Sequence, residues 1–369
     1  MRRLVYLSPV PWASYAQRPH HFVRWFRART RGEVLWVDPY PTRLPTAADW
    51  RRVGRADAPV DIVVPDWLHV VRPRALPIEP LPGSTFINRP LWCNILKRSS
   101  DFLAAGDAVI CIGKPSALAL DVLHGAAGVP AVYDAMDDFP AFYSGLSKVS
   151  MSRREGTILA QVSRVLVSST ALAGRFAAQD IEATLALNAC ATDTLPPVAA
   201  LPARPKTGVI GYVGTMGAWF DWELVTKIAE QNPQAQVRLI GPLYLPPPGA
   251  LPANVSLAPA CDHAAAIRAM TEFSVGLIPF RLTPLTASVD PIKYYEYRAL
   301  GLPVVSTRFG EMALRGRDDG VLLVGSGDQL SGLVETAGAL APTSANVAEF
   351  RTNNSWEARF DAAGIIGGL

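Results

Sequence analysis

The sequence has few cysteines and no long apolar run. Its four cysteines are spread over 369 residues, and none forms the close pair that is typical of zinc or redox sites. Prolines and serines interrupt the apolar residues near the start, so no signal sequence is expected. No apolar run approaches the roughly 20 residues that a membrane-spanning helix needs. These absences exclude a disulfide-rich secreted domain and favour a cytoplasmic protein.

Charge is distributed unevenly along the chain. The formal net charge is +3, but residues 1–100 contain sixteen Lys/Arg and seven Asp/Glu, which leaves a net negative charge on the remainder. A basic surface suits anionic lipid headgroups, an anionic acceptor or nucleic acid, and an ordinary solvated Arg-rich surface explains it equally well. Nucleic acid ranks last because the chain has no recognised binding motif.

Short apolar runs alternate with helical stretches, which predicts α/β architecture with parallel sheets. The strands expected in the first half are Leu4–Leu7, Val34–Val37, Ile62–Val64, Ala108–Ile112, Ala131–Asp134, Arg164–Ser168 and Thr184–Asn188. Those expected in the second half are Val209–Val213, Gln236–Ile240, Val255–Leu257, Ser274–Phe280, Pro303–Ser306 and Val321–Val324. Residues 43–95 are rich in Pro and Arg, which predicts irregular loops.

Four prolines between Leu195 and Thr207 predict a linker between the two series. We therefore expect a first domain at residues 1–200, a second domain at 207–345 and a C-terminal helical segment at 346–369. Within that last segment, Asn354 to Arg359 has the pattern of a capped helix start.

The strongest local motif runs from Asp290 to Ser306. Asp290 is a candidate helix cap, and Lys293 falls in the first turn, where its ammonium and free backbone amides suit a diphosphate. Glu296, one turn later, suits ribose hydroxyls, and Tyr294 lies between them. A single lysine or glutamate on a helix is usually a solvated surface group, but this ordered combination favours a nucleotide site.

A glycine-rich turn follows the strand expected at Val209–Val213 and precedes a helix that Asp221 is expected to cap. Its Gly-x-x-Gly-x-x-Gly spacing differs from the dinucleotide fingerprint, and the next strand runs into Gly241 without the acidic residue that holds an adenine ribose. A nicotinamide-dependent dehydrogenase is therefore disfavoured. Gly214, Thr215 and Gly241 become candidates for donor binding.

Three carboxylates, Asp134, Asp137 and Asp138, lie at the end of the strand expected at Ala131–Asp134. Ligands bind at this edge of a parallel sheet, and one of the three suits a general base whose neighbours raise its pKa. Metal ligation and helix capping are the alternatives.

Trp12, Arg18 and His20 follow the first expected strand and are candidates for contacts with an acceptor or a phosphate. A structural histidine is the ordinary alternative, and no third ligand accompanies His20 and its neighbour to make a metal site.

These residues together resemble the GT-B superfamily of glycosyltransferases, in particular the bacterial enzymes of capsule, exopolysaccharide and teichuronic-acid-type polymers. The blocks that carry the resemblance are Gln17-Arg18-Pro19, Asp134 to Phe139, Tyr212 to Gly214, Trp219 to Asp221, and Lys293 to Ser306. The resemblance implies two Rossmann-like domains with parallel sheets facing across a cleft. The first would bind the acceptor and the second the nucleotide sugar, and a final helix would cross back to the first domain.

The resemblance also implies roles for individual residues. Lys293 would contact the diphosphate and Glu296 the ribose, while Gly214 and Thr215 would line the phosphate approach. Asp137 would be the catalytic carboxylate. Ser288 stands where retaining members with paired glutamates have their second glutamate, so the stereochemistry stays open. Neither a metal nor another cofactor is required.

The expected function is transfer of a hexose-type sugar from a nucleoside diphosphate donor to a lipid-linked saccharide during synthesis of a bacterial surface polysaccharide. The basic first domain would contact the anionic inner face of the cytoplasmic membrane, and no nucleic acid partner is expected. Two alternatives remain, a nucleotide-sugar epimerase of the same fold and a non-catalytic binding subunit of a polysaccharide assembly complex. Neither the base nor the sugar of the donor follows from the sequence.

Overall fold

The computed structural model describes residues 2–40, 42, 64–201 and 208–367. The chain divides into two units. Unit 1 comprises Met1–Ser168, Leu172–Ala186 and Phe360–Leu369, and unit 2 comprises Ser169–Ala171 and Leu187–Arg359. Each unit has its own parallel sheet and its own hydrophobic core.

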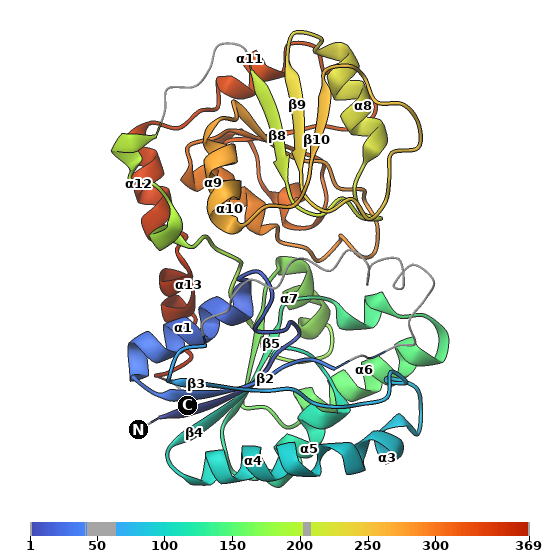
Figure 1. Ribbon diagram of the computed structural model, residues 1–369, viewed down its shortest axis with the longest axis vertical. Helices are drawn as coiled ribbons and strands as arrows, with labels where there is room; N and C mark the ends of the chain where they lie inside the picture. The colour runs from blue at the N-terminus through green and yellow to red at the C-terminus, as the bar shows by residue number, and fades with distance from the viewer. Residues whose placement is uncertain (1, 41, 43–63, 202–207, 368–369) are drawn as a thin grey trace. The chain divides into compact units, whose positions relative to one another are not determined.

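Unit 1 contains a seven-stranded sheet in the order β3-β2-β1-β4-β5-β6-β7 (Figure 1). Its strands are β1 Arg3–Leu7, β2 Glu33–Val37, β3 Leu68–Val71, β4 Ala108–Ile112, β5 Ala131–Ala135, β6 Arg164–Val167 and β7 Thr184–Leu185. All neighbouring pairs run parallel. The chain reverses its direction of sheet growth between β1 and β4, and in such sheets ligands bind at the carboxyl ends of the strands at this point.

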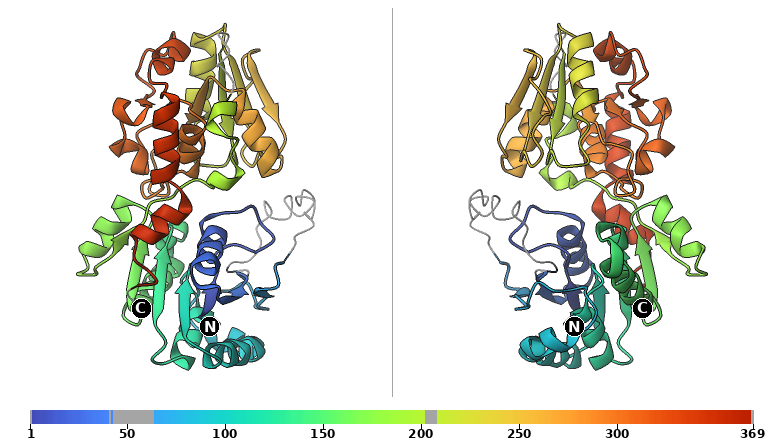
Figure 2. Two further views of the ribbon diagram at one scale, coloured as in Figure 1. Left: turned by 90° about the vertical axis from the view of Figure 1, so that its left-hand side faces the viewer. Right: turned by 90° about the vertical axis from the view of Figure 1, so that its right-hand side faces the viewer.

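Helices cover both faces of this sheet (Figures 1 and 2). The helical segments of the first half of the chain are α1 Arg18–Thr30, α3 Ser84–Asn88, η1 Arg89–Trp92, α4 Cys93–Ala104, α5 Ala117–Gly125, η2 Phe139–Phe142, α6 Gly145–Leu159 and α7 Thr170–Ala177. The central strand β4 is apolar throughout, with the fully buried sequence AVICI. This is typical of parallel strands that are covered on both faces.

Unit 2 contains a six-stranded parallel sheet in the order β10-β9-β8-β11-β12-β13. Its strands are β8 Val209–Val213, β9 Gln236–Ile240, β10 Val255–Ala258, β11 Val275–Ile278, β12 Val304–Ser306 and β13 Val321–Leu323. The remaining helical segments are η3 Thr192–Thr194, η4 Val198–Ala200, α8 Trp222–Gln231, α9 His263–Thr271, α10 Ile292–Ala299, η5 Gly310–Leu314, η6 Arg317–Asp319, α11 Leu333–Gly338, α12 Ser344–Asn353 and α13 Trp356–Ala362. Within the described ranges, no helix is both long and apolar enough to cross a bilayer.

The C-terminal residues return to unit 1. Phe360 packs on Phe22, with ring centroids 5.2 Å apart, and the Arg18 guanidinium lies 5.4 Å from the Phe360 ring centroid. The carboxylate of Asp361 accepts hydrogen bonds from Trp25 Nε1 and from Arg29. The end of the chain is thus bound to α1 by both apolar and polar contacts.

The strand pattern predicted from the sequence is confirmed for twelve strands, with ends that differ by a few residues. Irregular loops over residues 43–95 are wrong for the described part of this range, which contains β3, α3, η1 and the start of α4. Most of the strand expected at Ile62–Val64 and residues 202–207 of the expected linker lie outside the described residues. Asp221 caps α8 as expected, because its side chain accepts a hydrogen bond from Leu224 N at 3.1 Å.

Candidate functional site

Three of the predicted donor-binding residues lie together in unit 2, at the carboxyl edge of its sheet. Gly214 follows β8, Gly241 follows β9, and Lys293 is in the first turn of α10. The Gly214 amide donates a hydrogen bond to the Ile240 carbonyl at 2.8 Å, which joins the two glycine turns. A Cβ atom placed on Gly214 would lie 2.3 Å from Lys293 Cε and 2.6 Å from Lys293 Nζ. The lysine tip therefore occupies the space that a side chain at position 214 would fill.

The two glycines are required by backbone geometry. Gly214 has φ +145° and Gly241 has φ +142°, conformations that residues with a side chain rarely adopt. A Cβ on Gly241 would lie 2.2 Å from the Gly214 carbonyl oxygen, and backbone cannot swing aside as a side chain can. The glycines thus allow the two turns and the lysine to meet. Their own amides donate to the carbonyls of Ile240 and Ala258, so the amides suited to a phosphate are those of the first turn of α10.

Lys293 is placed as a free cation. Among the described residues, no carboxylate or carbonyl accepts a hydrogen bond from its ammonium, which lies 5.5 Å from the Tyr212 ring centroid. Desolvation lowers the pKa of Lys293, and the charge of Glu296 opposes this shift. The amides of the first turn of α10 have no side-chain cap. The cation and the helix terminus are both suited to an anion.

Glu296 lies one turn after Lys293 and is only partly exposed. Its Oε1 atom is 3.2 Å from Nε2 of His263, the first residue of α9, and this contact raises the pKa of the histidine. Among the described residues, none donates a hydrogen bond to its second carboxylate oxygen, which can accept one from a hydroxyl. Thr215 is half-buried beside Gly214, and its carbonyl accepts a hydrogen bond from Tyr212 at 2.8 Å.

The side chains of Asp290 and Tyr294 are buried in contact with other residues and do not join Lys293, Gly214 and Gly241. The buried Asp290 carboxylate accepts hydrogen bonds from Asn188 N at 2.7 Å, Tyr295 at 2.9 Å and Arg315 at 2.7 Å. Tyr294 is buried, with the Arg315 guanidinium 3.8 Å from its ring centroid. The expected capping role of Asp290 is wrong, because Pro291 is the N-cap of α10. The contact of Asp290 and Tyr294 with the donor stays a prediction, and the burial of both side chains does not support it.

In unit 1 the three predicted catalytic carboxylates occupy two different environments. Asp134, in β5, is fully buried and accepts hydrogen bonds from Arg18 Nε at 2.9 Å and Arg18 Nη2 at 2.7 Å. Asp137 and Asp138 follow the strand and are half-buried. Asp138 is 3.2 Å from Arg175, whereas the carboxylate of Asp137 accepts no hydrogen bond from any described residue.

Asp137 has the electrostatics of a general base. Desolvation and the charge of Asp138 raise its pKa from 3.8 to about 7, against the opposing charge of Arg18. A carboxylate with a pKa near neutrality accepts a proton efficiently and also loses it readily. Of the cluster, Asp137 therefore fits the predicted catalytic role best.

The predicted acceptor contacts Trp12, Arg18 and His20 are all buried. His20 Nε2 is 3.2 Å from the Trp12 carbonyl oxygen, and burial lowers the pKa of His20 to about 4. The Trp12 amide donates a hydrogen bond to Asp38 at 2.8 Å. These contacts are structural, and a role in acceptor binding stays a prediction.

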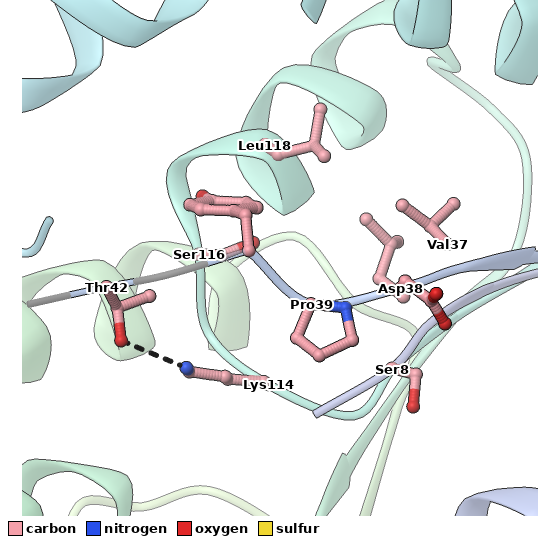
Figure 3. Close-up of a pocket in the computed structure, with 10 residues that line it drawn as sticks. Ser8, Val37, Asp38, Pro39, Thr42, Lys114, Ser116 and Leu118 are labelled. Atoms are coloured by element: carbon pink, nitrogen blue, oxygen red, sulfur yellow. Dashed lines mark hydrogen bonds between the residues drawn. The ribbon is translucent and has the colours of Figure 1, made fainter. Parts of the chain in front are cut away.

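A pocket that the sequence analysis missed opens at the carboxyl ends of β1, β2 and β4, where the strand order reverses. It is small, and Figure 3 shows Lys114 pointing to Thr42, whose hydroxyl accepts a hydrogen bond from the ammonium at 3.3 Å. Asp38 and Ser116 also line it. Desolvation lowers the pKa of Lys114. The signal available was the Gly-Lys-Pro-Ser sequence directly after the strand Ala108–Ile112.

No set of three or more His, Cys, Asp and Glu side chains in the described ranges is arranged to hold a metal ion. Asp134 and Asp138 have arginine partners instead.

No protein-family model and no curated protein sequence matches the chain. Solved structures do. Sucrose-phosphate synthase from Thermosynechococcus elongatus is similar with a TM-score of 0.68 and 16% identity, over 100% of this chain and 98% of that one. HepE from Anabaena, in complex with UDP-glucose, is similar with a TM-score of 0.66 and 13% identity over 100% of both chains. AviGT4, a glycosyltransferase of avilamycin A biosynthesis, is similar with a TM-score of 0.59 and 13% identity, over 100% of this chain and 98% of that one.

At these identities the likeness establishes the fold. The predicted fold class is confirmed: the chain has two parallel α/β sheet units of the GT-B type, as these glycosyltransferases do.

Proposed function

We propose that this protein is a glycosyltransferase that uses a nucleoside diphosphate sugar. The observation that carries the proposal is the meeting of Lys293 with Gly214 and Gly241 at the carboxyl edge of a parallel sheet, where the ammonium has no carboxylate partner among the described residues. The diphosphate of the donor would bind there, and Glu296 would accept hydrogen bonds from the ribose. HepE was crystallised with UDP-glucose, so uridine nucleotides are the first donors to test.

In the proposed reaction, Asp137 removes the proton from an acceptor hydroxyl. The acceptor oxygen forms a bond to the anomeric carbon of the sugar, the bond from that carbon to the diphosphate breaks, and the nucleoside diphosphate leaves with the electron pair. Lys293 and the first amides of α10 stabilise the negative charge that develops on the leaving group. In metal-dependent enzymes a metal ion neutralises the charge of the leaving diphosphate. Here Lys293 and the amides of α10 would do so, and we therefore propose a metal-independent reaction.

The proposed acceptor is a lipid-linked saccharide of a bacterial surface polysaccharide, and the proposed setting is the cytoplasmic face of the membrane. The basic composition of residues 1–100 supports contact with anionic lipid. The predicted cleft between the domains remains part of this proposal.

A thermal-shift panel of nucleoside diphosphates and their sugars tests donor binding. A ligand that binds only the folded state raises its stability, by about 2.7 kcal/mol at a hundredfold excess over Kd. We expect one nucleotide to shift the wild type and the Lys148→Met control, whose lysine is exposed on α6, but not Lys293→Met. The proposal fails if no nucleotide shifts the wild type or if Lys293→Met responds equally.

Product analysis separates transfer from the alternatives. Release of nucleoside diphosphate that depends on added acceptor supports transfer. Conversion of the donor sugar without acceptor supports an epimerase, and donor binding without any turnover supports a non-catalytic subunit.

A further inference from the structure

Three helical segments of unit 1 follow one another without a break, from α3 (Ser84–Asn88) through η1 (Arg89–Trp92) to α4 (Cys93–Ala104). Their inner side is defined by Asn88, Trp92, Ser99 and Leu103, which are all buried and recur at spacings of four or seven residues. This spacing is that of one helix face. The opposite side of the run is therefore directed away from the core.

That outer side carries large apolar side chains at its N-terminal end. Phe86 is 84% exposed, Ile87 56% and Leu91 48%, and the preceding Leu81 is 47% exposed. Single exposed apolar residues are ordinary, but four within eleven residues form a patch that water solvates poorly. We name these four residues the apolar end.

Cations follow on the same side. Two sets of exposed residues repeat at helical spacings. One set is Ile87, Leu91 and Arg98, at intervals of four and seven residues. The other is Phe86, Cys93 and Lys97, at intervals of seven and four. The three residues of the apolar end that lie in the run thus share its outer surface with the two cations.

Cations outnumber acids around this surface, where Asp101 of α4, three residues after Arg98, is an exposed carboxylate. From Arg72 to Arg98 the chain contains five cations, all exposed: Arg72, Arg74, Arg89, Lys97 and Arg98. The single acidic residue in this range, Glu79, is buried and bound to Arg154. Arg72 pairs with Asp38 and Arg89 with Asp121, whereas Arg74, Lys97 and Arg98 have no carboxylate partner among the described residues.

We propose that this surface docks the protein on a bilayer of anionic lipid. Exposed aromatic and aliphatic side chains insert at the boundary of headgroups and acyl chains, while Lys and Arg on the same helix bind the headgroup phosphates. A protein partner of similar shape would need acidic groups facing unpaired cations, and an anionic bilayer supplies such charge over any area. The inference rests on the proposed function, because contact with the membrane would bring a lipid-linked acceptor to the enzyme.

Vesicle flotation tests the docking surface. The full chain is mixed with vesicles of phosphatidylglycerol and phosphatidylcholine in equal parts, and with vesicles of phosphatidylcholine alone. We expect binding to the mixed vesicles only, weakened on the order of tenfold in Phe86→Ser/Ile87→Ser and in Lys97→Gln/Arg98→Gln. Leu314→Ser, which removes a leucine of 66% exposure from unit 2, is the matched control and should bind like the wild type.

All substituted residues are exposed, so the variants should fold, and equal melting temperatures check this. The proposal is overturned if the wild type does not float with mixed vesicles, or if either double variant floats as well as Leu314→Ser. It is also overturned if gel filtration shows a wild-type dimer that the Phe86→Ser/Ile87→Ser variant dissociates, since the occupant is then a second copy. Donor binding in the thermal-shift panel is measured without lipid, so failure of the proposed function is visible independently of vesicle binding.

Discussion

Substitution of Gly214 by alanine tests whether the glycine turn acts through Lys293. The new Cβ would lie 2.3 Å from Lys293 Cε, whereas ordinary contacts begin at 3.4 Å, so the lysine tip must move by about 1 Å. A charge-assisted hydrogen bond contributes about 1.5–3 kcal/mol, and its loss weakens donor binding about tenfold to a hundredfold. The backbone at φ +145° adds about 1–3 kcal/mol of strain, which lowers the stability of the folded protein.

Gly332→Ala is the matched control for backbone strain. Gly332 is also in unit 2 and has φ +66°, but the nearest atom to its Cβ position is Glu335 Oε2 at 3.7 Å. We expect this variant to lose stability in urea unfolding and to keep the donor affinity of the wild type.

The assay is calorimetric titration of the donor into Gly214→Ala, Lys293→Met and the double variant. If the alanine acts by displacing the lysine, the double variant binds no more weakly than Lys293→Met alone. Additive losses would refute this reasoning, and so would an equal loss of affinity in Gly332→Ala.

Three further predictions concern the base, the buried ion pair and the metal. With the pKa of Asp137 at about 7, the transfer rate should rise as pH increases through 7, and Asp137→Asn should lose this step while still binding donor in calorimetry. The pKa of Asp137 in the folded state lies above the ordinary value of 3.8, so its ionisation destabilises the folded state as pH rises from about 4 to 7. Asp137→Asn should therefore have a higher melting temperature than the wild type above neutral pH. Below pH 3.8 the two melting temperatures should be equal. Arg18→Leu should cost about 3–5 kcal/mol in urea unfolding because it leaves Asp134 charged and buried, whereas Arg29→Leu, which breaks a half-exposed pair with Asp361, should cost under about 1 kcal/mol. Transfer should persist in EDTA, and its complete loss with recovery on addition of a divalent cation would contradict the metal-independent reaction.

The sequence predicted the sheets well because buried parallel strands are continuous apolar runs bounded by turn residues. It missed β3, Leu68–Val71, whose two central residues are only half-buried and whose surroundings are rich in proline and arginine. A half-buried strand at the sheet edge leaves a short and weak pattern, so periodicity alone does not separate it from a loop.

The donor cluster was partly predictable for a topological reason. Neighbouring parallel strands end at the same edge of the sheet, so residues that follow β8 and β9 must lie close together. The partners of Asp290 were not predictable, since they come from Asn188 and Arg315, far from it in the sequence. Local spacing alone therefore assigned Asp290 to the donor, although its carboxylate already accepts hydrogen bonds from other residues of the protein.

The aspartate cluster shows how one short segment yields two different carboxylates. Asp134 lies within β5 and points into the interior, where only a paired charge is tolerable, and Arg18 supplies that pair. Asp137 lies beyond the end of the strand and accepts no hydrogen bond from an arginine of the described residues. Partial desolvation and the charge of Asp138 therefore raise its pKa. Arg18 still acts on Asp137 at longer range, because its positive charge lowers the pKa of that carboxyl. The buried pair therefore adjusts the proposed base as well as supporting the fold: Arg18→Lys, which keeps the charge, should leave the pH at which the transfer rate rises close to 7. In a folded Arg18→Gln variant that step should move to higher pH, and an unchanged step there would show that Asp137 is not the titrating base.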